Sequence, residues 1–174
     1  MVDQNNPLML LMAPSGMDKG QVREQDLIKI NADGHVVLGN GQASAETALH
    51  LAIINQTDAG AVLHTHSPIG TVLSRYHEQD GFIAFEGWEM LKGLRGIKTH
   101  ATRVDIPIVA NDQDMNRLSE AIKPPLSKAP NGLLVSGHGL YSWGQNLAEA
   151  RRHVEIIEFL LDLSWRQHML GGCG

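Results

Sequence analysis

The sequence predicts an α/β fold in which a sheet is covered by helices. Short apolar runs typical of strands alternate with longer segments whose apolar residues recur every three or four positions, as they do in helices. The chain has 174 residues, which suits one domain with one continuous core. Its hydrophobic content of 43% is ordinary for a globular protein. We therefore expect residues 1–174 to form a single domain.

The first elements are predicted to be strands. Residues 7–13 form an apolar run that stops at Pro14-Ser15-Gly16, which indicates a strand and a turn. Residues 27–30 and 36–38 flank an Asp-Gly step and predict a hairpin. Ser44 is placed to cap a helix. The apolar face of that helix would contain Leu49, Ile53 and Ile54.

The middle of the chain alternates between strands and helices. Residues 61–63 lead into His64-Thr65-His66 as a short buried strand, and Pro68 suits the start of a helix that continues through residues 71–76. Residues 83–85 and 104–110 predict further strands, the second weakened or bent by Pro107. Residues 114–123 predict a helix that ends at Pro124-Pro125.

The C-terminal part contains the clearest helix. Residues 133–135 form a strand that runs into Gly137-His138-Gly139 and resumes at residues 140–143, where Trp143 is expected to pack in the core. From residue 146 to about residue 170, apolar side chains recur at helical spacing. The order of the strands does not follow from these patterns. The recurring residues are Leu147, Ala150, Val154, Ile157, Leu161 and Trp165.

Composition excludes several classes of function. A net charge of −5 and a pI near 5.9 give no broad basic surface for nucleic acid or anionic membrane, although a small phosphorylated substrate remains compatible. Cys173 is the sole cysteine, so an intrachain disulfide is excluded. The residues resemble no signal peptide and contain no apolar stretch of membrane-spanning length. We expect a soluble, cytoplasmic protein.

Three histidines predict a metal site. His64 and His66 stand two apart on a predicted strand, so their side chains emerge from one face. His138 lies between two glycines at the end of another strand, where the backbone can turn sharply. Three imidazoles with an open fourth position form a catalytic zinc arrangement. A His-x-His pair alone is weak evidence for metal binding.

The remaining histidines share no such pattern. We interpret them as surface or structural residues, and His100, which precedes a strand near the predicted site, is also assigned a structural role. The others are His35, His50, His77, His153 and His168.

Several blocks of sequence, in their order along the chain, are similar to the class II aldolase/adducin family. The two most specific blocks are Glu89-Met90-Leu91-Lys92-Gly93 and Gly-His-Gly-Leu-Tyr-Ser-Trp-Gly at residues 137–144. The resemblance extends from residue 14 to about residue 165. The other matching blocks are Pro14-Ser15-Gly16 with Lys19-Gly20, Ser44-Ala45-Glu46-Thr47, residues 61–67, and Pro107-Ile108 with Asn111-Asp112.

The resemblance implies a fold, an activity and an assembly. The fold would be a central, mostly antiparallel sheet with helices on both faces, and the protein would assemble as a homotetramer with its sites near subunit boundaries. Within the family, the blocks most resemble members that use Zn²⁺ to dehydrate 5-methylthioribulose 1-phosphate to 2,3-diketo-5-methylthiopentyl 1-phosphate in methionine salvage. The usual N-terminal helix and a Gly-Gly-Asn-x-Ser phosphate-binding segment are expected to be missing from this chain.

Two other functions stay open at this point. One is a class II aldolase or epimerase that acts on another ketose phosphate, because a fold does not fix a reaction. The other is a non-catalytic, adducin-like interaction module. Such a module would be expected to have lost its metal ligands, whereas His64, His66 and His138 are all present.

The resemblance also implies roles for individual residues. Glu89 matches the position of the dehydratase acid/base, and Glu46 matches the catalytic glutamate of the related aldolases, although it also suits the first turn of a helix. We rank Glu89 first and Glu46 second. The candidate ligands for the substrate phosphate are Ser15, Gly16, Lys19 and Ser44.

Overall fold

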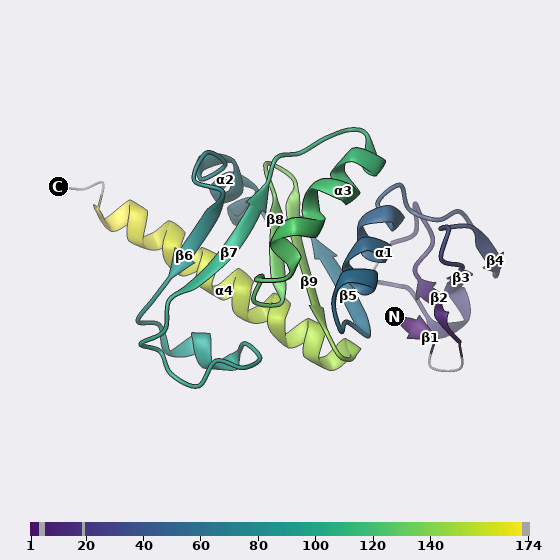
Figure 1. Ribbon diagram of the computed structural model, residues 1–174, viewed down its shortest axis with the longest axis horizontal. Helices are drawn as coiled ribbons and strands as arrows, with labels where there is room; N and C mark the ends of the chain where they lie inside the picture. The colour runs from purple at the N-terminus through teal and green to yellow at the C-terminus, as the bar shows by residue number, and fades with distance from the viewer. Residues whose placement is uncertain (4–5, 19, 172–174) are drawn as a thin grey trace.

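The computed structural model describes residues 1–3, 6–18 and 20–171 (Figure 1). Strands and helices alternate along most of the chain, as the sequence predicts. The strands are β1 (Val2–Asp3), β2 (Asn6–Met12), β3 (Ile28–Ile30), β4 (Val36–Leu38), β5 (Ala61–Thr65), β6 (Phe82–Phe85), β7 (Val104–Val109), β8 (Gly132–Val135) and β9 (Gly139–Gly144). The helices are α1 (Thr47–Gln56), α2 (Pro68–Tyr76), α3 (Met115–Leu126) and α4 (Leu147–Gly171), with short 3-10 turns η1 (Glu24–Asp26) and η2 (Glu89–Gly93).

The central sheet has the strand order β5-β9-β8-β7-β6. Its β7 and β8 run parallel, and the other neighbouring pairs of the described sheet are antiparallel. One apolar cluster packs α1 and α3 against one face, through residues such as Leu133 and Tyr141. A second cluster packs α2 and α4 against the other face, through Leu134 and Leu140. The predicted α/β class, with a mostly antiparallel sheet covered on both faces, is confirmed.

The N-terminal strands form a second, smaller sheet that the sequence patterns do not separate from the first. Its order is β1-β2-β3-β4, and each neighbouring pair is antiparallel. Leu10, Ile28 and Ile30 are buried in it and pack against Leu51 and Ile54 of α1. Helix α1 therefore lies between the two sheets (Figure 1).

Two predicted helix boundaries are wrong. Ser44 does not cap α1, which has Glu46 at its N-cap position. The carbonyl of Ser44 instead accepts hydrogen bonds from the backbone and the hydroxyl of Thr47, which closes a turn before the helix begins. Helix α3 continues through Pro124 and Pro125 to Leu126. Prolines have helical φ values, so they are tolerated in this last turn, and the buried Leu126 packs in the core.

The described helices include none that is both long enough and apolar enough to span a membrane. The long helix α4 instead buries one face on the central sheet, with Ile157, Leu160 and Leu161 fully buried. Its other face is polar or partly exposed. This pattern agrees with the helical spacing seen in the sequence.

Candidate metal centre

The central sheet brings the three predicted histidines together at one edge. His64 lies near the end of β5 and pairs across the sheet with Tyr141 of β9. His66 follows β5 directly, and His138 lies in the turn between β8 and β9. Because β5 and β9 are antiparallel neighbours, the end of one strand lies beside the start of the other. The prediction that these residues share one location is therefore consistent with the structure.

Their ring nitrogens converge on one point together with a carboxylate. The Nε2 atoms of His64 and His66 are 2.6 Å apart. Oε1 of Glu46 lies 2.9 Å from Nε2 of His138 and 3.6 Å from Nε2 of His64. One ligand atom from each of the four residues lies within 4.8 Å of all the others. This is the donor set of a transition-metal site with three imidazoles and one carboxylate.

A backbone carbonyl determines the tautomer of His64. Its Nδ1 lies 2.9 Å from the carbonyl oxygen of Leu140, which can only accept a hydrogen bond. Nδ1 therefore carries the proton, and the lone pair of Nε2 faces the cluster. Burial lowers the pKa of His64 to about 4, so the ring is neutral near pH 7. A neutral imidazole with its other nitrogen donating to a carbonyl is the usual state of a metal ligand.

The ring of Tyr141 packs against the ring of His64. The two rings are stacked, with centroids 4.0 Å apart and an angle of 15° between their planes. The Tyr141 side chain is fully buried, and its hydroxyl has no hydrogen-bond partner among the described residues. Burial, and then the nearby carboxylate of Glu46, raise the pKa of Tyr141. The hydroxyl therefore stays protonated and can donate a hydrogen bond.

Gly139 is required by the close approach of the histidine rings. A Cβ at this position would lie 2.2 Å from the carbonyl oxygen of Thr65, and 2.9 Å and 3.0 Å from ring carbons of His66 and His64. These distances are shorter than real side-chain contacts allow. On the other side of His138, Gly137 has a φ of +62°, which favours glycine. A side chain larger than glycine is therefore disfavoured on both sides of His138.

Helix α2 holds the turn that carries His138. The Thr71 hydroxyl donates to the carbonyl of His138 at 3.1 Å. The Ser74 hydroxyl accepts from the backbone N–H of Gly137 at 3.1 Å, and the Ser136 hydroxyl donates to Glu78 at 2.6 Å. These supporting residues could not be recognised from the sequence, because hydroxyl groups on a helix give no signal of a partner far along the chain.

The two predicted carboxylates lie in different places. Glu46 is in the cluster and becomes a candidate metal ligand. Glu89 lies in η2, where it is 68% exposed, forms an ion pair with Lys92, and lies 3.4 Å from Nδ1 of His100. Because η2 connects the end of β6 to the start of β7, it lies at the edge where β7 and β8 begin, whereas His138 follows the end of β8. Within one chain, Glu89 is therefore at the opposite edge of the sheet from the histidines. Figure 1 shows the strands β6, β7, β8 and β9 that separate these two places.

The predicted phosphate ligands lie partly near the cluster. Ser15 and Gly16 form an exposed turn, held by a 2.8 Å hydrogen bond from the Ser15 N–H to the carbonyl of Gln42. Ser44 lies between Gln42 and Glu46 in the loop before α1. The N–H of Glu46 donates to the Ser44 hydroxyl at 3.3 Å. Lys19 lies outside the described residues.

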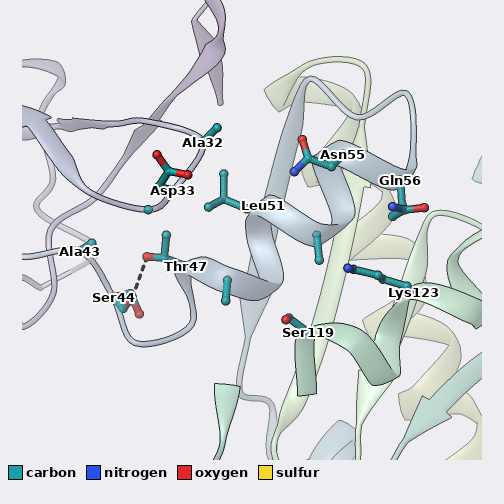
Figure 2. A pocket seen from close by; sticks show the side chains of 13 residues that line it. Ala32, Asp33, Ala43, Ser44, Thr47, Leu51, Asn55, Gln56, Ser119 and Lys123 are labelled. Carbon is teal, nitrogen blue, oxygen red and sulfur yellow. Dashed lines mark hydrogen bonds between the residues drawn. The ribbon is translucent and has the colours of Figure 1, made fainter. Parts of the chain in front are cut away.

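Two cavities adjoin α1. The first has a volume of about 510 Å³, and Glu46, His50 and His64 form part of its wall beside apolar residues of β2 and β5. The second, of about 410 Å³, lies between α1, α3 and the β3–β4 turn, and Figure 2 shows Asp33, Thr47 and Lys123 around it. Its lining includes none of the three histidines, so the first cavity is the one associated with the candidate metal centre.

The chain matches a known family over nearly its whole length. Residues 2–165 fit the model of the class II aldolase and adducin N-terminal domain. The chain belongs to this family.

Relatives within the family are named methylthioribulose-1-phosphate dehydratase. The one from Xanthomonas campestris pv. campestris (strain 8004) is 47% identical over 149 residues, which cover 84% of this chain and 69% of the relative. The one from Stenotrophomonas maltophilia (strain R551-3) is 44% identical over 160 residues, covering 91% and 75%.

Several solved structures share the fold. An L-fuculose 1-phosphate aldolase superposes with a TM-score of 0.79 at 21% identity, covering 98% of this chain and 75% of that one. YgbL from Escherichia coli superposes with a TM-score of 0.75 at 26% identity, covering 89% and 72%. Because the L-fuculose 1-phosphate aldolase is 21% identical to this chain, its similarity shows a shared fold alone.

Proposed function

We propose that this chain is a methylthioribulose-1-phosphate dehydratase that uses zinc and acts in methionine salvage in the cytoplasm. The observation that carries the proposal is the convergence of His64, His66, His138 and Glu46 within 4.8 Å, in a chain 47% identical to a dehydratase of that name. The reaction removes a proton next to the substrate carbonyl and expels the hydroxyl of the next carbon as water. The enol that remains becomes the 2,3-diketone.

The residues of the cluster fit a zinc ion. His64, His66 and His138 would hold it, and Glu46 would take the remaining protein position or give it up to substrate. The ion would supply Lewis acidity, which lowers the cost of the negative charge created by proton removal beside the carbonyl. Leu140 keeps His64 in the tautomer that this role requires.

Ser15, Gly16 and Ser44 are proposed to bind the substrate phosphate. The turn of Ser15 is tied to Gln42, so these residues lie along the loop that leads into Glu46. Backbone N–H groups and hydroxyls at a turn provide donors for an anion. A phosphate held here would orient the reacting carbons of the substrate toward the cluster.

Glu89 is proposed to transfer the proton from a second copy of the chain. Within one chain it lies at the far edge of the sheet, so it can reach a cluster only across a subunit boundary, as the expected homotetramer allows. Lys92, through a hydrogen bond and its charge, holds the pKa of Glu89 below its ordinary value. Glu89 is therefore ionised at neutral pH and able to accept a proton.

Incubation with methylthioribulose 1-phosphate tests the reaction. Formation of the diketone is expected, and formation of an aldehyde by carbon–carbon cleavage would instead identify an aldolase. Failure to convert any ketose phosphate, with metal bound, would favour a non-catalytic module.

Mixed assemblies test the shared site. Assemblies of His64→Ala and Glu89→Gln chains, purified by two different tags, should regain activity that neither variant has alone, because some sites then combine an intact cluster with an intact Glu89. No regain in the mixed assembly would contradict a Glu89 contributed by another chain.

A further inference from the structure

A second pair of histidines lies where α2 ends beside the last turns of α4. His77 follows α2, and its Nδ1 lies 2.8 Å from Oδ2 of Asp80. An ionised carboxylate can only accept, so Nδ1 carries the proton, and in the neutral ring Nε2 carries a lone pair. This Nε2 atom is buried and has no hydrogen-bond partner among the described residues. Buried acceptors usually have a hydrogen-bond partner, and a bound ion would explain why this one has none.

His168 offers a second lone pair beside the first. Its Nδ1 lies 2.8 Å from the carbonyl oxygen of Ser164, which again places the proton on Nδ1 and the lone pair on Nε2. The centroids of the His77 and His168 rings are 5.8 Å apart. In the three-histidine cluster the corresponding distances are 4.5 to 5.0 Å. With zinc–nitrogen bonds of about 2.1 Å, two imidazoles on one tetrahedral ion have centroids roughly 5 Å apart. The His77–His168 centroid distance exceeds this by less than 1 Å, so a shared ion requires a movement of the exposed His168 ring.

The surroundings of the pair leave one side open. The Tyr76 ring stands nearly edge-on to both imidazoles, 4.9 Å from His77 and 5.8 Å from His168. On another side, both histidines form part of the wall of a cavity of about 570 Å³, together with Asp80, Ser164 and Gln167. An ion could therefore approach from this cavity, where water would complete its coordination.

We propose that His77 and His168 form a second metal site, which takes a divalent transition-metal ion. Each imidazole already has the outer partner that metal ligands use, a carboxylate for His77 and a backbone carbonyl for His168. Two nitrogen donors favour copper, nickel or zinc over magnesium or calcium. The bound ion would link the end of α2, which supports the His138 turn, to the C-terminal part of α4. This site is independent of the proposed dehydratase activity.

Metal titration by calorimetry tests the site in the full chain. The wild-type protein, after chelator treatment, should bind two Zn²⁺ or Ni²⁺ ions per chain, and the His168→Ala variant should bind one. A variant with alanine at His64, His66 and His138 should retain one ion, which a further His77→Ala change removes. Mg²⁺ should not bind at the pair.

Because His168 is exposed, the His168→Ala variant should fold as the wild type does. Circular dichroism checks that its secondary structure is unchanged. His35→Ala, at an exposed turn, is the matched control and should leave the number of ions unchanged. Equal metal binding by wild-type and His168→Ala proteins would overturn the proposal. Because His168 is outside the candidate active site, its loss should leave dehydratase turnover unchanged.

Discussion

The two regions that carry the predicted functional residues are built in different ways. At the edge where β8 ends, His64 and His138 are partly buried, and His66 beside them is exposed. The carbonyl of Leu140 contacts His64, and Thr71 of helix α2 donates to the carbonyl of His138. At the opposite edge, η2 presents Glu89 to solvent, where it forms ion pairs with the exposed side chains of Lys92 and His100. The proposed metal ligands thus lie together within one chain, whereas the proposed role of Glu89 requires the surface of another chain.

The difference between the two edges is tested most sharply by replacing Glu89. Glu89→Gln should lower turnover by about 10²–10⁴-fold, because it removes the proposed proton acceptor, and should leave metal content unchanged. Steady-state kinetics and elemental analysis measure the two effects. Glu120→Gln is the matched control, since Glu120 is equally exposed and also pairs with a lysine three residues later. Metal loss in Glu89→Gln, or full turnover, would contradict the separation of roles.

Gly139→Ala should damage the preorganised edge. The new Cβ would collide with the Thr65 carbonyl and both nearby imidazoles, so the strands or rings must shift. We expect a loss of about 1–3 kcal/mol in the free energy of unfolding, together with weakened metal binding. Urea unfolding and metal titration measure these effects. Gly171→Ala, where a Cβ meets no atom within 4 Å, should change neither property.

Acid should destabilise the buried edge selectively. Burial lowers the pKa of His50 to about 4, whereas an unfolded histidine titrates near 6.5. Between these values the unfolded chain binds more protons, so stability should fall as pH drops from about 6.5 to 4 and level off below. The loss from this residue is at most about 3 kcal/mol.

The test of this acid effect compares two histidines by urea unfolding of metal-free protein at several pH values. His50→Gln should flatten the dependence, although His64 will still contribute. His100→Gln, in the exposed region beside Glu89, should leave it unchanged. Equal slopes in the wild type and His50→Gln would contradict the lowered pKa of His50.

Ser74→Ala tests the support that helix α2 gives to the turn of His138. It leaves the N–H of Gly137 without its partner, which should cost about 1–3 kcal/mol of stability. Loss of an outer support of this kind should weaken metal binding by about 10-fold. Ser127→Ala, at an exposed end of α3, is the control. An unchanged metal affinity in Ser74→Ala would show that the turn of His138 positions itself.

The sequence predicted the local features well and the long-range ones poorly. Period-two spacing placed His64 and His66 on one face, and Gly137 has the local conformational reason that the sequence suggests, a positive φ. Gly139 is instead required by its close approach to Thr65, far along the chain. The partnership of these residues with Glu46 depends on how α1 packs against the sheet, which no local pattern encodes. The same limit applies to Ser74 and to the pairing of His77 with His168, since each joins segments far apart in the chain.

The small N-terminal sheet shows this limit again. The hairpin of β3 and β4 follows from an Asp-Gly step, but whether it joins the main sheet depends on packing against α1. The continuation of α3 through Pro124 and Pro125 likewise depends on the burial of Leu126. At α3, local propensity was overruled by tertiary contacts.

The central claim is that His64, His66 and His138 hold a metal ion which the reaction needs. The most direct test is elemental analysis of the purified, zinc-repleted wild type and His64→Ala variant, with turnover of methylthioribulose 1-phosphate measured on the same samples. The account predicts one fewer zinc ion per chain in the variant and no diketone formation. Equal zinc content in both proteins, or an active variant without that ion, would contradict it.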